Sequence, residues 1–164
     1  MKRLNEFRGM PAQWKTVTGS SRETMSLGRV FGAIIPAGTT VSLQGGLGSG
    51  KTYFIKGVCS GLGISSEVLS PSFILAEEYR GDLTVFHFDL YRLEELGEVY
   101  DIGLFDAADG RNIVLVEWGD RLPEESFDFD LKVEIDIRSD NIRDIRFTAP
   151  VNFISSLKEA RHEE

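Results

Sequence analysis

The strongest constraint on this chain is a cluster of glycines between an apolar run and an amphipathic segment. In "VSLQGGLGSGKTYF" (41–54), four of the residues 45–50 are glycine, and Lys51 follows directly. Each glycine weakens regular structure, so the cluster needs a reason other than packing. The β-branched run 39–44 predicts a strand, and the apolar residues of 54–59 recur at helical spacing. The sequence therefore predicts a strand, a glycine loop and a helix.

This loop fits the phosphate-loop pattern G-x-x-x-x-G-K-[ST], which begins at Gly45 and ends at Thr52. Without Cβ atoms in the way, backbone N–H groups can turn inward and surround an anion with the helix N-terminus. Lys51 would bring a charge to the β- and γ-phosphates, and the Thr52 hydroxyl would bind Mg²⁺. We therefore predict an ATP or ADP site with Lys51 as a catalytic residue. Its predicted members are Gly45, Gly48, Ser49, Gly50, Lys51 and Thr52.

Two further apolar runs end in acids, and these acids are candidates for the metal site. "TVFHFD" ends at Asp89, and "IVLVE" ends at Glu117. A carboxylate directly after a buried strand costs desolvation unless a cation or hydrogen bonds meet it. We predict Glu117 as a metal ligand and Asp89 as a catalytic residue that orients water or the metal shell.

The remaining patterns predict the fold around this loop. A capping box at 20–23 begins a helix that ends before Pro36, and Gly61 is suited to ending the helix after the loop. "FILAEEY" and "LTVFHFDL" flank an Arg-Gly-Asp turn, and "LKVEIDIR" alternates before a second turn at 139–141. The predicted class is α/β, a single P-loop NTPase-like domain over 1–164 with a mixed parallel and antiparallel sheet flanked by helices. About 15 N-terminal and about 8 C-terminal residues are expected to be loosely held.

Composition limits the function classes. The chain has 26 acidic and 18 basic residues and a net charge of -8, which argues against tight, direct nucleic-acid binding by this chain alone. No apolar run approaches about 18 residues and no signal peptide is evident, so we expect a cytoplasmic protein without a membrane segment. Cys59 is the only cysteine, which excludes intrachain disulfides. His87 lies among apolar residues and is expected to be a core histidine.

Several strings, in their order and spacing, resemble the TsaE (YjeE) family. They are "GGLGSGKT", "SPSFILAEEY", "HFDLYRL" and "VEWGDRLP", and the resemblance extends over 21–147. The family consists of small bacterial P-loop ATPases required for the threonylcarbamoyladenosine modification of tRNA. "HFDLYR" together with "VEW" is far more specific than the phosphate loop alone.

The resemblance implies an ATP site at the loop, Mg²⁺ held by Thr52 and Glu117, and a functional role for Asp89. It also places Trp118 beside the nucleotide and matches Thr24 to a threonine in the first helix of the family. Further cofactor-binding candidates are Tyr53 and Ser72, which stand where the family commonly has threonine. Ser72 belongs to "LSPSF" (69–73), a segment whose hydroxyls could reach a γ-phosphate. The family commonly has Asp where Gly46 stands and Ala where Ser49 stands, and the missing acid leaves any contact that it made in doubt.

The implied partners are threonylcarbamoyl-transfer proteins of the TsaB and TsaD type, with tRNA bound indirectly through them. Two other classes share a phosphate loop. A small-molecule kinase usually closes an arginine-rich lid, and no insertion here clusters arginines; a GTP switch needs N/T-K-x-D and D-x-x-G, and neither string occurs. Arg92 and Arg121 each follow a candidate acid, as surface residues or as contacts to phosphate or a partner.

Overall fold

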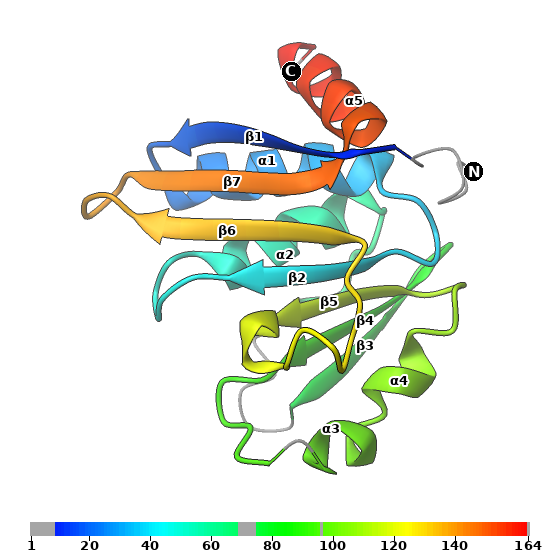
Figure 1. The fold of residues 1–164 in the computed structure, drawn as a ribbon. Helices are drawn as coiled ribbons and strands as arrows, with labels where there is room; N and C mark the ends of the chain where they lie inside the picture. The colour runs from blue at the N-terminus through cyan, green and yellow to red at the C-terminus, as the bar shows by residue number, and fades with distance from the viewer. Residues whose placement is uncertain (1–8, 69–74, 96, 164) are drawn as a thin grey trace.

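The computed structural model describes residues 9–68, 75–95 and 97–163. Within these residues, seven strands form one sheet with the order β1-β7-β6-β2-β5-β4-β3 (Figure 1). Their bounds are β1 Pro11–Thr18, β2 Thr40–Gln44, β3 Ala76–Arg80, β4 Thr84–Asp89, β5 Ile113–Glu117, β6 Leu131–Ile137 and β7 Arg143–Pro150.

The centre of the sheet is parallel and its margins are antiparallel. β6, β2, β5 and β4 pair in parallel, whereas β3 pairs antiparallel with β4, and β7 pairs antiparallel with both β6 and β1. The predicted mixed α/β sheet is therefore confirmed. The two predicted hairpins are also present, as β3–β4 and β6–β7.

Helices cover both faces of the sheet unequally. α1 (Ser21–Ile34) and α2 (Lys51–Gly61) lie behind the sheet in Figure 1, and α5 (Val151–His162) packs on the same core. Two short helices, α3 (Gly97–Asp101) and α4 (Leu104–Ala107), together with the 3₁₀ turn η2 (Gly119–Arg121), adjoin β4 and β5. Along β5, Ile113 and Leu115 join the first core, and Val114 and Val116 join the second. In the described part of the chain, no helix has the length and apolarity needed to cross a membrane.

The predicted cap of α1 is present. Ser20 Oγ accepts from the Glu23 N–H at 3.1 Å, and Glu23 Oε2 accepts from the Gly19 N–H at 2.8 Å. Glu23 thus reaches one residue further back than a standard capping box requires. This cap fixes where α1 begins, close to the end of β1.

Glycines allow α1 and α2 to pack with their backbones in contact. A Cβ on any of four glycines would lie 2.0–2.2 Å from a backbone oxygen of the other helix; these are Gly28, Gly32, Gly57 and Gly61. Each pair is spaced by four residues, so its members lie on one face of their helix. α2 ends at Gly61, as predicted, but the positive φ (75°) after the helix belongs to Gly63, and Gly61 itself is a packing residue.

The sequence patterns did not predict β1 or α5. β1 pairs with β7 from Pro11 to Thr18, and Trp14 stacks on Phe147 with ring centroids 5.4 Å apart. α5 buries Phe153, Ile154 and Leu157. Parts of the two ends that we expected to be loosely held are therefore regular elements of the fold.

Candidate nucleotide-binding site

The predicted site residues meet at one edge of the sheet, where parallel strands end. β2 leads into the glycine loop, while β4 and β5 end at Asp89 and Glu117, which are direct partners in the register. Leu43 near the end of β2 is in turn the partner of Glu117. Ligands of open α/β sheets bind at the carboxyl ends of such strands. This edge is therefore where a functional site is expected.

The glycine loop has a shape that side chains would prevent. Gly45 has φ 137°, and a Cβ there would lie 2.2 Å from the Ile135 carbonyl oxygen. Gly50 is the N-cap residue of α2 with φ 110°, and no side chain caps this helix. The N–H groups of the first turn of α2 are therefore left for an anion. The local geometry is suited to binding an anion.

Lys51 is buried at the start of α2 and folds over the loop. Its Nζ donates to the carbonyl oxygens of Gly45 (2.8 Å) and Gly46 (3.0 Å) and lies 4.1 Å from the centroid of the Trp118 ring. Burial lowers the pKa of Lys51, and the carboxylates of Glu117 and Asp89 oppose that shift. A phosphate beside Lys51 would compensate the buried charge better than the loop carbonyls do.

Glu117 receives two hydrogen bonds on one oxygen. Glu117 is only 4% exposed, and its Oε1 lies 2.9 Å from both the Thr52 hydroxyl, which donates to it, and His87 Nε2. Hydroxyl and carboxylate oxygens are the ligands that Mg²⁺ prefers. The pair therefore fits a magnesium ion that phosphate oxygens would complete. His87 is fully buried, as expected of a core histidine, but it also contacts the predicted metal ligand.

Asp89 lies beside Glu117 and is 3% exposed. One of its oxygens, Oδ1, accepts from the Tyr91 N–H at 3.0 Å. Both acids and Lys51 line a cavity of about 190 Å³. The other lining residues are Leu47, Gly48, Ser49, Gly50, Thr52, Tyr53, Tyr91 and Trp118.

Trp118 covers one side of this cavity in an unusual backbone conformation. Its φ is 61°, in the left-handed region that bulky residues rarely adopt. The Trp118 N–H donates to the Leu43 carbonyl at 2.8 Å, and its ring lies 5.1 Å from that of Tyr91. The fold thus tolerates local strain in order to place an aromatic ring over Lys51.

The other predicted residues lie at different distances from this centre. The Thr24 hydroxyl is 2.8 Å from that of Thr18, and the Thr24 methyl group faces Gly50, so Thr24 supports the loop.

Tyr53 is half-exposed at the rim, and Ser49 is buried. Arg121 donates to the Leu90 carbonyl oxygen at 3.1 Å, which is a structural contact. Ser72, with the rest of 69–73, lies outside the described residues.

A residue that the sequence patterns did not single out, Arg143, contacts the back of the loop. At the start of β7, it donates to the carbonyl oxygens of Ser49 (2.9 Å) and Gly48 (3.3 Å). The available signal was its place in the alternation of β7, where Ile145 and Phe147 point into the core.

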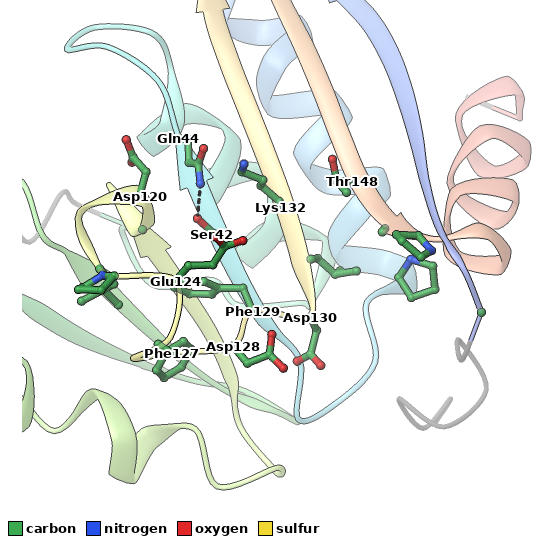
Figure 2. A pocket seen from close by; sticks show the side chains of 18 residues that line it. Ser42, Gln44, Asp120, Glu124, Phe127, Asp128, Phe129, Asp130, Lys132 and Thr148 are labelled. Atoms are coloured by element: carbon green, nitrogen blue, oxygen red, sulfur yellow. Dashed lines mark hydrogen bonds between the residues drawn. The ribbon is translucent and has the colours of Figure 1, made fainter.

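A larger hollow of about 1120 Å³ lies on the sheet face away from α1 and α2, between β6 and the segment 119–130 (Figure 2). Four acids line it, namely Asp120, Glu124, Asp128 and Asp130. The Asp130 carboxylate is occupied in holding the N–H and hydroxyl of Thr40, each at 2.8 Å. None of the described residues that line this hollow belongs to the glycine loop, which begins directly after Gln44 of β2, and the sequence patterns did not predict the hollow.

Comparison with known proteins agrees with the resemblance stated above. The family model "Threonylcarbamoyl adenosine biosynthesis protein TsaE" matches residues 18–145. The chain is 37% identical over 131 residues to the tRNA threonylcarbamoyladenosine biosynthesis protein TsaE of Treponema pallidum, covering 80% of this chain and 97% of that protein. It is also 37% identical over 154 residues to TsaE of Bacillus subtilis, covering 92% of this chain and 95% of that protein.

A solved structure extends the likeness to three dimensions. The crystal structure of Bacillus subtilis YdiB superposes with a TM-score of 0.72 at 33% sequence identity, covering 96% of this chain and all of that one. The family match, the identities and the superposition all cover the glycine loop and both acids. This chain belongs to the TsaE family.

Proposed function

We propose that this chain binds Mg²⁺–ATP at the glycine loop and hydrolyses it as a subunit of the machinery for tRNA N6-threonylcarbamoyladenosine synthesis. The observation that carries the proposal is the convergence of Lys51, Thr52, Asp89 and Glu117 on one cavity beside an uncapped helix N-terminus. The names of the relatives supply the pathway. The proposed location is the cytoplasm.

Each residue has a proposed task. Thr52 and Glu117 would hold the ion, which supplies charge neutralisation on the phosphate oxygens when bound. Lys51 would exchange its two carbonyl partners for the β- and γ-phosphates. Asp89 would orient the attacking water, and the Trp118 ring would keep bulk water from one side of Lys51.

We further propose that hydrolysis is slow in the isolated chain and faster with partners of the TsaB and TsaD type. Hydrolysis needs charge stabilisation in the transition state, and a cation supplied by a partner can contribute about 10³–10⁵ in rate. A net charge of -8 makes this chain a poor ligand for tRNA by itself. The tRNA would therefore be held mainly by the partners, and ATP hydrolysis would reset the complex between turnovers.

Binding can be tested by tryptophan fluorescence. Trp14 and Trp118 are the two tryptophans, so a Trp14→Phe variant reports Trp118 alone. Because Lys51 should leave the Trp118 ring when phosphate arrives, titration with Mg-ADP should change the emission. An unchanged spectrum at saturating Mg-ADP, with no heat of binding by calorimetry, would contradict the nucleotide site.

Turnover is then measured for the chain alone, with the partner proteins, and with tRNA alone. We expect stimulation by the proteins and little by tRNA. Rapid hydrolysis that ignores the partners but rises with a small-molecule acceptor would support a kinase instead.

A further inference from the structure

We propose that Arg143 is a positioning residue for the phosphate loop, holding two of its peptide groups in the orientation that nucleotide binding requires. This role presupposes the proposed nucleotide site and adds to it a residue from β7, which β6 separates from β2 in the sheet. Arg143 lies 91 positions beyond Thr52 in the chain, and nothing in the phosphate-loop pattern includes it.

The guanidinium group of Arg143 bridges two loops. Towards the glycine loop, Nε donates to Ser49 O at 2.9 Å and Nη2 donates to Gly48 O at 3.3 Å. Towards the β6–β7 turn, Nη1 lies 2.9–3.2 Å from three backbone carbonyl oxygens, those of Ser139, Asp140 and Ile142. The contacts to the β6–β7 turn hold the guanidinium group in one position. From this position the guanidinium restrains the carbonyl groups of Gly48 and Ser49 in the glycine loop.

Holding a carbonyl oxygen decides where the adjoining N–H points. In a trans peptide the C=O and N–H point in opposite directions, and no cis peptide bond occurs in the described residues. The carbonyls of Gly48 and Ser49 face Arg143, so the N–H groups of Ser49 and Gly50 face the other way. The Ser49 N–H does point into the loop, where it donates to Gly46 O at 3.1 Å.

These inward N–H groups belong to the part of the loop that would surround phosphate. Glycines at 48 and 50 leave the loop free to adopt other shapes, because both have positive φ and neither would bring a Cβ closer than 3.8 Å to a neighbouring atom. Lys51 holds the carbonyl oxygens of Gly45 and Gly46, and Arg143 adds a restraint on the carbonyl oxygens of Gly48 and Ser49. Its planar fork of donors serves two loops at once, which a lysine ammonium with freely rotating donors cannot reproduce.

The place of Arg143 in the sheet agrees with this role. It is the first residue of β7 and is in register with Thr18 of β1, whose hydroxyl contacts Thr24 behind the loop. It is half-buried on the face that carries core side chains further along β7. A charged group in that position is costly unless polar partners meet it, and backbone oxygens of the two loops do so.

The test measures binding of ADP and of inorganic tripolyphosphate, each with Mg²⁺, by calorimetry. The variants are Arg143→Met, Arg143→Lys and Arg143→Ala. Matched controls are Arg138→Met, which loses the ion pair with Asp144 in the same hairpin, and Arg146→Met, which loses the pair with Glu134 on the opposite face. Thermal unfolding without ligand identifies a temperature at which every variant is folded.

We expect Arg143→Met and Arg143→Lys to weaken binding of both ligands by at least about tenfold. A loss of this size corresponds to one hydrogen bond made by a charged group. Both controls should bind like the wild type. Added methylguanidinium should partly restore binding to Arg143→Ala, which a general loss of stability would not permit.

Wild-type affinity in Arg143→Met would overturn the positioning role while leaving the proposed function intact. Equal losses in Arg143→Met and Arg138→Met would also overturn it, because hairpin stability would then be the cause. A wild-type chain that binds neither ligand would contradict the proposed function itself, and the role of Arg143 with it.

Discussion

Lys51 is a charged residue whose burial disfavours the protonated form. Because burial lowers its pKa below the ordinary value of 10.5, the unfolded chain keeps the Lys51 proton to a higher pH than the folded chain. Between the two pKa values the unfolded state binds more protons, so the contribution of Lys51 to stability rises with pH. Relative to Lys51→Met, wild-type stability should improve as pH rises towards 10.5.

Urea denaturation of both proteins at several pH values between 7 and 10.5, without nucleotide, measures this difference. Lys51→Met should also lose ATP binding and turnover. A stability difference that stays constant or falls with pH would contradict the buried-charge account.

Substitutions of Glu117 and of Asp89 are expected to impair different steps, metal binding and turnover. If Glu117 holds the metal with Thr52, Glu117→Gln should lose the Mg²⁺ dependence of nucleotide binding. If Asp89 orients water, Asp89→Asn should bind Mg-ATP and turn over about 10²-fold or more slowly. Calorimetry with and without Mg²⁺, together with single-turnover kinetics, separates the two. Loss of metal dependence in Asp89→Asn alone would exchange the roles.

For single residues, the sequence predicted the site positions that a continuous motif or the end of an apolar strand marks. Gly45 to Thr52 form one continuous motif, and each acid ends its own apolar strand, so position in the chain sufficed. His87 and Arg143 act through contacts that depend on strand register and on a distant hairpin. No spacing rule connects Arg143 with Ser49, and for that reason its contact could not be predicted.

The position of the phosphate loop depends on how closely α1 and α2 pack against each other. Lys51 and Thr52 are the first residues of α2, and a Cβ on Gly32 of α1 would lie 2.2 Å from the Val58 oxygen of α2. Gly32→Ala must therefore separate the helices, with an expected loss of about 1–3 kcal/mol in the free energy of unfolding and weaker nucleotide binding.

Gly97→Ala is the control, because a Cβ built there would meet no atom within 4 Å among the described residues outside its own helix turn. Chemical denaturation and ADP titration of both variants decide the matter. Gly32→Ala with the stability of Gly97→Ala would show that the helices can separate without cost.

The sequence patterns did not predict β1 and α5, and the physical reason is different for each. β1 alternates exposed with only partly buried residues and fully buries Thr18 alone, and its pairing with the distant β7 determines its conformation. α5 begins directly after Pro150 with only three buried residues, so its helical pattern is faint. The α1–α2 glycines look like weak points in a helix until the second helix is in place.

For the whole molecule, the rate at which a thiol reagent labels Cys59 can report how often the core opens. It is the only cysteine, is fully buried in the main core, and burial raises the pKa of its thiol to about 12. A raised pKa means that the thiol, not the reactive thiolate, is present at pH 8. A thiol reagent should therefore label Cys59 only when the core opens.

The labelling rate at pH 8 should slow when Mg-ADP is added, because a ligand that binds only the folded state stabilises it. In urea above the unfolding transition, labelling should be fast with or without nucleotide. Fast labelling in native buffer would mean that α2 opens independently of the rest of the core.

The hydrogen bonds that Lys51 makes to its own loop also bear on exchange of the nucleotide. Two carbonyl oxygens of the loop accept hydrogen bonds from Lys51 Nζ, so the ammonium has acceptors that do not depend on a phosphate. Under the proposed function, the same two carbonyl oxygens would compete with the phosphates for Lys51, and their hydrogen bonds would form again when a phosphate leaves.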